Sequence, residues 1–177
     1  MKKARVLRKF DQLNMQLERL LEAMEVQQEE RLSKSPGRGA WSPVQVLQHL
    51  ILTESSSLKY LQKKVSSGLS HIPNATWLTA ARVLVFRIYI ALPIKTKAPR
   101  AMAEEYFPEV DTFAEVAETY RKTRKELRLF LENLPEEAFN LEIFRHPVAG
   151  KLALDGLVTF FVLHFNRHER QIRRLLD

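Results

Sequence analysis

Long stretches of this sequence place apolar residues at intervals of three and four, which is the spacing of one face of an α-helix. The first stretch runs from about Val6 to Arg31, and its apolar positions are Phe10, Leu13, Leu17, Leu20, Leu21 and Met24. Only 5 Gly and 8 Pro occur among the 177 residues, so few breaks interrupt such stretches. A chain of this length can enclose one core. The sequence therefore predicts an all-α protein with a single domain, residues 1–177.

Three more long helices are expected after the first. Ser42-Pro43 offers an N-cap followed by proline at the first helical position, and this helix should continue to about Ser66. A third helix should open at 111–112 and run to about residue 133, and the last should cover 153–176. A short helix, 76–91, is expected in the second connection. Four long helices favour a four-helix bundle, although the periodicity leaves its connectivity open.

The composition excludes several classes of protein. The chain contains no cysteine, which excludes a disulfide framework, thiolate metal ligands and a cysteine nucleophile. Its basic start is not followed by the apolar segment of a signal peptide, so a cytoplasmic protein is expected. The longest apolar stretch, 77–94, contains Arg82 and Arg87. Two arginines in a short span make a poor membrane-crossing helix, and an amphipathic or partly buried segment is expected instead.

The net charge of +7 is concentrated in one part of the chain. No acidic residue occurs from Ser55 to Ala103, and the basic residues of this stretch are Lys59, Lys63, Lys64, Arg82, Arg87, Lys95, Lys97 and Arg100. A region of one sign attracts anions, such as a phosphorylated or carboxylated ligand, an acidic partner or nucleic acid. A solvated basic surface without a partner is the plainer interpretation. The sequence leaves the role of stretch 59–100 open.

His164 and His168 are four residues apart on the last expected helix. Four residues advance a helix by about 40° beyond one full turn, so both imidazoles project from one face. The apolar residues of the same face are Leu157, Phe161, Ile172 and Leu175. The pair is therefore expected to point inward, where its ring nitrogens need partners. One metal ion would satisfy both rings, and a chance pair with separate hydrogen bonds is the alternative.

His49 is the third candidate ligand. It has apolar neighbours in the second helix, and its polar neighbours along the face are Gln45, Thr53 and Ser56. Small polar residues beside such a histidine fit the wall of a pocket, whereas a core histidine bonded to threonine or a backbone carbonyl is the simpler alternative. With His164 and His168 it would form a three-nitrogen set that leaves positions open for water or substrate. Imidazoles suit Zn, Ni, Fe or Cu and do not discriminate among them.

The two remaining histidines have weaker claims to the site. His71 stands in a loop rich in Ser, Gly and Pro and is expected to be exposed. His146 precedes Pro147 in an irregular connection that also contains Gly150. It either approaches the site, caps a helix or has no special role.

Two polar residues close to the histidines in sequence, Glu54 and Gln171, are expected to point in different directions relative to the site. Glu54 is five residues from His49, about 140° around the helix, so it is expected to face elsewhere. No general base is identified, and the catalytic residues remain unknown. Gln171 lies close to the His168 face and is expected to hydrogen-bond that ligand from behind.

Three segments resemble motifs of the DinB-like family. Trp41-Ser42-Pro43 followed by His49-Leu50 resembles the W-S-P…H-L opening of the family's second helix. Residues 146–152 (HPVAGKL) and 164–172 (HFNRHERQI) resemble its H-P-x-x-G-x-L and H-x-N-R-H-x-x-Q-I patterns. The resemblance covers most of the domain, while the loop 91–108 aligns with no characterised relative.

This resemblance implies an up-down-down-up four-helix bundle with His49, His164 and His168 as the metal ligands. It also implies a divalent metal, commonly Zn or Ni, and a homodimer. The family includes YfiT-type proteins, which are regarded as metal-dependent hydrolases or thiol-dependent S-transferases. A low-molecular-weight thiol is therefore an expected co-substrate.

The leading interpretation is a cytoplasmic metal-dependent enzyme, of the hydrolase or thiol S-transferase type, acting on an unidentified and anionic small molecule. A non-catalytic metal-binding or stress-response protein of the same fold is the alternative. A third interpretation is binding to nucleic acid or a membrane surface through the basic stretch. No recognition motif or interleaved aromatic residues support nucleic-acid binding.

Overall fold

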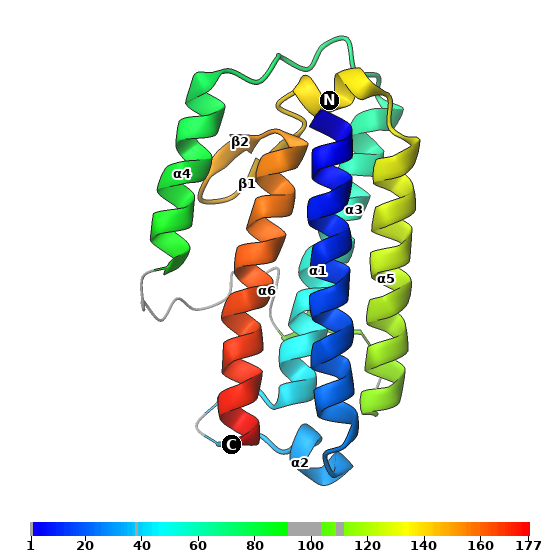
Figure 1. Ribbon diagram of the computed structural model, residues 1–177, viewed down its shortest axis with the longest axis vertical. Coiled ribbons are helices and arrows are strands. Elements are labelled where there is room, and N and C mark those ends of the chain that lie inside the picture. Colours follow the sequence, from blue (N-terminus) through cyan, green and yellow to red (C-terminus); the bar gives the residue numbers. More distant parts are fainter. Residues whose placement is uncertain (1, 38, 92–103, 109–111) are drawn as a thin grey trace.

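The computed structural model describes residues 2–37, 39–91, 104–108 and 112–177, which are mostly helical (Figure 1). The long helices are α1 (Lys2–Glu25), α3 (Pro43–Ser66), α5 (Phe113–Asn133) and α6 (Leu154–Leu176). The shorter elements are α2 (Glu29–Ser33), α4 (Trp77–Ala91), the 3-10 helices η2 (Glu104–Tyr106) and η3 (Glu136–Asn140), and the strands β1 (Phe144–His146) and β2 (Gly150–Leu152). Lys95, Lys97 and Arg100 of the basic stretch and Asp111 of the expected third helix lie outside the described residues.

The four long helices lie side by side around an apolar core (Figure 1). Helix α3 packs against α5 and α6, and α1 packs against the same two helices. The apolar positions predicted for the first helix are all buried, as the three-and-four spacing requires. Helix α4 lies outside this group, against α6 and β2.

The capping residues start two of these helices as the sequence predicts. The Ser42 side chain accepts from the backbone N–H of Gln45, and the Gln45 side chain accepts from the N–H of Ser42. Thr112 and Glu115 form the same reciprocal pair at the start of α5. Such a capping box satisfies donors that the helix itself leaves unpaired, so both starts are set locally.

The expectation of one continuous first helix to Arg31 is wrong. Helix α1 ends at Glu25, and the chain turns before α2 begins at Glu29. This turn lets Leu32 reach the core, where it is 1% exposed. The Glu29 side chain also accepts from the backbone N–H of Phe113, at the start of α5. No Gly or Pro marks the turn, so tertiary packing decides it.

The expectation of an irregular connection around His146 is also wrong. Strands β1 and β2 form an antiparallel hairpin, in which Phe144 pairs with Leu152 and His146 with Gly150. Phe144 and Leu152 are buried, and their burial holds the two short strands against the helices. Gly150 has a φ of 72°, which a residue with a side chain rarely adopts. The protein is thus mostly helical with a small two-stranded sheet.

Candidate metal centre

Three histidine side chains meet between α3 and α6. His49 lies in the first half of α3, and His164 and His168 lie one turn apart on α6. The Nε2 atom of His164 is 3.2 Å from Nε2 of His49 and 3.1 Å from Nε2 of His168. His49 is buried, and the other two are partly buried. The structure thus brings together the three histidines singled out by the sequence.

The spacing of the three Nε2 atoms suits one shared ion. Two nitrogens bound to Zn at about 2.0–2.1 Å are roughly 2.9 Å apart at a right angle and roughly 3.3 Å apart at the tetrahedral angle. The two distances centred on His164 fall between these values. Hydrogen bonds explain this arrangement of three nitrogens less well than an ion does. A single proton can bridge only two of the nitrogens, so the third would lack a partner within the cluster. The cluster can therefore bind a metal ion.

Burial holds the imidazoles of His164 and His168 in the neutral form. It is the main cause that lowers the pKa of His164 well below its ordinary value, and the neighbouring His168 and His49 lower it further. Burial likewise lowers the pKa of His168 to about 3, although the hydrogen bond to Gln171 opposes this. A neutral imidazole has the lone pair that a metal requires, so no proton has to be displaced at neutral pH.

Gln171 fixes which nitrogen of His168 faces the cluster. The Nδ1–H group of His168 donates to Oε1 of Gln171, at 2.9 Å. Since a carbonyl oxygen only accepts, the proton is on Nδ1 and the lone pair on Nε2 faces the other histidines. The expected hydrogen bond behind His168 is therefore present.

Aromatic rings cover the His49 side of the cluster. The ring centroid of Trp41 is 4.8 Å from that of His49, and Phe107 is 5.5 Å from Trp41. Gln48 donates from Nε2 to the carbonyl oxygen of Pro108 at 3.2 Å, which holds the segment 104–108 beside α3. These rings reduce the access of water to His49 and strengthen electrostatic interactions near it.

His146 approaches the cluster from the hairpin without joining it. Its ring is 4.6 Å from Phe160, which stacks on His164 at 5.2 Å with an interplanar angle of 23°. Nδ1 of His146 accepts from the backbone N–H groups of Val148 and Ala149, each at 3.1 Å. Burial lowers its pKa to about 4. His146 thus stabilises the hairpin turn and packs behind a ring that supports His164.

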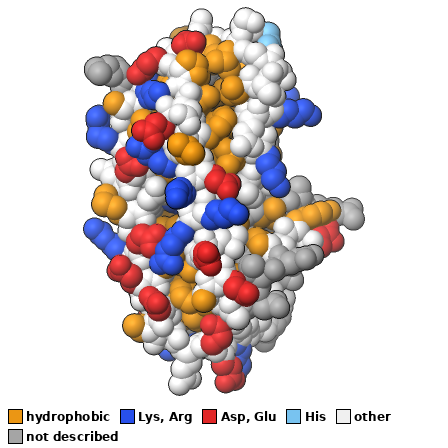
Figure 2. All heavy atoms as spheres, turned by 90° about the vertical axis from the view of Figure 1, so that its right-hand side faces the viewer, with side chains coloured by type: hydrophobic (Ala, Val, Ile, Leu, Met, Phe, Trp, Pro, Cys, Tyr) orange, Lys and Arg blue, Asp and Glu red, His pale blue; other side chains and the backbone are white. Residues whose placement is uncertain are grey.

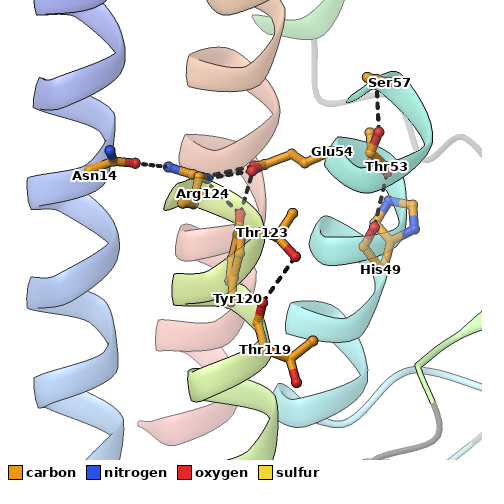
Figure 3. Close-up of polar contacts among 9 residues, drawn as sticks. All are labelled: Asn14, His49, Thr53, Glu54, Ser57, Thr119, Tyr120, Thr123 and Arg124. Carbon is orange, nitrogen blue, oxygen red and sulfur yellow. Dashed lines mark hydrogen bonds and ion pairs between the residues drawn. The ribbon is translucent and has the colours of Figure 1, made fainter. Parts of the chain in front are cut away.

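Glu54 faces away from the histidines, as its position on the helix predicts. Its carboxylate accepts two hydrogen bonds from Arg124, one of them from Nη2 at 2.8 Å, and a third from the Tyr120 hydroxyl at 2.8 Å (Figure 3). Asn14 of α1 accepts from Arg124 at 3.3 Å. Burial is the largest single influence on Arg124 and opposes its charge, but the attraction and hydrogen bonds of Glu54 and Tyr120 together outweigh it, so the pKa of Arg124 is raised. Glu54 is therefore held in an ion pair and is not a base for the histidine cluster.

Two of the three polar neighbours of His49 singled out from the sequence, Gln45 and Thr53, form hydrogen bonds within α3 or to its N-cap. The Gln45 side chain caps α3, and Thr53 donates to the backbone carbonyl of His49 at 2.9 Å. Ser57 donates to the carbonyl of Thr53 at 2.8 Å in the same way (Figure 3). His71, the fifth histidine, is exposed as expected.

The sequence reasoning missed the aromatic residues around the cluster. Phe160 precedes His164 by four residues, so the helical spacing that paired the histidines could also have found it. The sequence indicated Trp41 only as part of the Trp41-Ser42-Pro43 motif and did not predict its contact with His49. Phe107 carries no local signal, because the contact joins segments more than fifty residues apart.

Comparison with known proteins identifies one related family. The profile of the DinB superfamily matches residues 12–172. This range includes all three histidines of the cluster, the whole of α3, and α6 as far as Ile172. Searches of curated proteins and of solved structures find no match to this chain. Among the described residues, no helix is both long and apolar enough to cross a membrane.

Proposed function

The chain belongs to the DinB superfamily, and on this basis we propose that it is a metal-dependent enzyme whose ligands are His49, His164 and His168. The observation that carries the proposal is the convergence of three Nε2 atoms at 3.1–3.2 Å around His164. The neutral state of His164 and His168 supports it, because a metal binds the neutral form. We further propose one domain over 1–177, with the long helices in an up-down-down-up bundle. Figure 1 supports this topology, since α1 and α6 run one way and α3 and α5 the other.

The surrounding residues have defined roles in such a site. Gln171 keeps the lone pair of His168 on Nε2, and Phe160 supports the ring of His164. Trp41 and Phe107 limit the access of water from the side of His49. A divalent ion such as Zn or Ni, when bound, supplies a Lewis acid that lowers the pKa of a nearby water or thiol. The site is thus suited to making a nucleophile at neutral pH.

The reaction we propose is hydrolysis or thiol-dependent S-transfer on an anionic small molecule. The stretch from Ser55 to Ala103, which has no acidic residue, supports an anionic substrate or a carboxylated low-molecular-weight thiol. The family resemblance supports a cytoplasmic homodimer. Light scattering in solution tests the dimer, and a mass of one chain would contradict it.

Metal content tests the ligand assignment directly. Protein purified without a polyhistidine tag and reconstituted with Zn or Ni should hold about one equivalent per chain. His164→Ala should hold almost none, whereas the matched variant His71→Ala, which changes an exposed histidine, should bind as the wild type does. Less than about a tenth of an equivalent in reconstituted wild type would refute the metal centre.

A non-catalytic metal-binding protein is the second candidate. The metal-binding group found among the described residues consists of histidines only, with no carboxylate to act as a base. A screen of hydrolysis and thiol-transfer substrates separates the two functions. The enzyme proposal expects turnover in the wild type and none in His168→Ala. Equal activity in both proteins, or no turnover of any substrate by metal-loaded wild type, would favour the second candidate.

A further inference from the structure

Helix α4 exposes a strip of large apolar side chains. Five of them are about half exposed or more: Trp77 (76%), Leu78 (47%), Leu84 (60%), Val85 (67%) and Ile88 (60%). At about 100° per residue they span an arc of about 120° on the helix surface. Thr79 and Phe86 lie on the opposite side and are 3% and 4% exposed. The strip therefore points away from the rest of the protein, as the outer position of α4 in Figure 1 also indicates.

The strip is bordered by positive charge. On the same helical projection, Arg82 lies about 40° beyond one edge and Arg87 about 60° beyond the other. Arg82 is 3.3 Å from Glu142, whose side chain is only 10% exposed and so presents little negative charge outside. No other acidic side chain of the described residues forms an ion pair with α4.

The hairpin beside α4 adds to this charge. Arg145 and Lys151 are direct cross-strand partners, and both are exposed. Two cations in this position destabilise a hairpin unless an anion lies nearby. Strand β2, which carries Lys151, contacts α4. Basic side chains thus lie on α4 itself and on the hairpin that contacts it.

We propose that α4 docks on an anionic phospholipid surface, with its apolar strip among the acyl chains and its arginines at the headgroups. An exposed apolar face with basic borders and a tryptophan is typical of helices that lie in the membrane interface. Fifteen residues make a helix about 22 Å long, shorter than the roughly 30 Å hydrocarbon core, so α4 lies on the bilayer and does not cross it.

A second copy of the chain fits the strip less well. In a two-fold interface the same patch meets itself, which would bring the arginine borders together. A standard protein interface also uses about 20–30 residues a side, many more than this strip offers. An anionic bilayer requires no complementary protein shape, and its negative charge attracts the Lys and Arg side chains near the strip.

Vesicle co-sedimentation tests the proposal. The protein should bind vesicles of phosphatidylcholine mixed with phosphatidylglycerol, and bind vesicles of phosphatidylcholine alone at least about tenfold more weakly. Val85→Glu removes apolar contact and adds a repelled charge, so it should reduce binding about tenfold or more. Leu129→Glu on α5 is the matched control, since Leu129 is 56% exposed, and should bind as the wild type does. No binding to anionic vesicles at low salt, or equal binding by Val85→Glu, would overturn the proposal.

Two measurements separate lipid docking through α4 from docking through another surface and from self-association of the chain. Brominated lipids should quench tryptophan fluorescence in the wild type and not in Trp77→Phe, because Trp77 lies in the strip and Trp41 does not. Quenching that persists in Trp77→Phe would contradict docking through α4. Light scattering without vesicles should give the same mass for Val85→Glu as for the wild type. A mass that falls from two chains to one in Val85→Glu would show a protein interface instead.

Discussion

Helix α3 contributes to two buried polar clusters that are balanced in opposite ways. At Glu54, the carboxylate meets Arg124 and the Tyr120 hydroxyl, so charge and hydrogen bonds are matched within the cluster. Five residues earlier, His49 meets two more histidines, and the three like nitrogens converge on one another. The comparison teaches that burial alone does not mark a ligand site. Internal complementarity indicates a stabilising role, and convergence without complementarity is typical of a group that can hold an ion.

The largest expected effect comes from breaking the complementary cluster. Arg124→Met leaves the Glu54 carboxylate, which is 1% exposed, without its ion pair. Removing one partner of a buried pair lowers the free energy of unfolding by about 3–5 kcal/mol. Urea denaturation at neutral pH measures this loss, and metal binding per folded molecule should persist.

Arg121→Met is the matched control for that experiment. Arg121 is also on α5 and pairs with Glu18 at 2.9 Å, but both side chains are about half exposed. Figure 2 shows the outer face on this side of the molecule, where acidic and basic side chains alternate in solvent. Loss of the Arg121–Glu18 ion pair should lower the free energy of unfolding by no more than about 1 kcal/mol. Equal losses in the two variants would mean that the Glu54 cluster contributes no more than a surface pair.

Breaking the histidine cluster should affect the metal-bound protein much more than the metal-free one. His49→Leu replaces a buried ring with an apolar side chain of similar size, so metal-free stability should change by less than about 1.5 kcal/mol. Wild type gains about 2.7 kcal/mol when the free metal is a hundredfold above its dissociation constant, and the variant should lose this gain. Thermal unfolding with and without Zn measures both. A Zn-induced gain that survives in His49→Leu would exclude His49 as a ligand.

A smaller loss is expected when only the support behind a ligand is removed. Gln171→Leu deletes the acceptor for Nδ1–H of His168, so the ring can adopt the wrong tautomer. Loss of such a partner lowers metal affinity by about 10–100-fold. Competition with a chromogenic chelator measures the affinity. A variant with wild-type affinity would show that Gln171 does not orient the ring.

The smallest effect expected near neutral pH is a dependence of metal-free stability on acid. Burial lowers the pKa of folded His168 to about 3, against an ordinary value of 6.5. The stability that depends on neutral His168 is therefore fully present above about pH 6.5 and is lost as the pH falls toward 3. Each proton taken up on unfolding gives a slope of up to about 1.4 kcal/mol per pH unit. Urea titrations with a chelator should show a flatter slope in His168→Gln, and an unchanged slope would contradict this origin.

Much of the fold follows from local signals in the chain. Ser42-Pro43 and Thr112 start their helices through contacts within three residues, so the sequence alone was enough to place both starts. The turn after Glu25 and the hairpin around Gly150 were missed. Both depend on apolar side chains, Leu32, Phe144 and Leu152, that find their contacts far along the chain.

By itself, the sequence determined most of the helical segments, the shared face of His164 and His168, and that Glu54 points in a different direction from His49. Helical geometry relates residues within a few turns, so these features need no knowledge of the rest of the chain. Only the tertiary structure decided that His49 lies 3.2 Å from His164, that Glu54 pairs with Arg124 and that Trp41 and Phe107 cover the site. These contacts join different helices and connections, and their distances depend on how those elements pack. The sequence predicted the candidate ligands, and packing decided how closely their nitrogens converge.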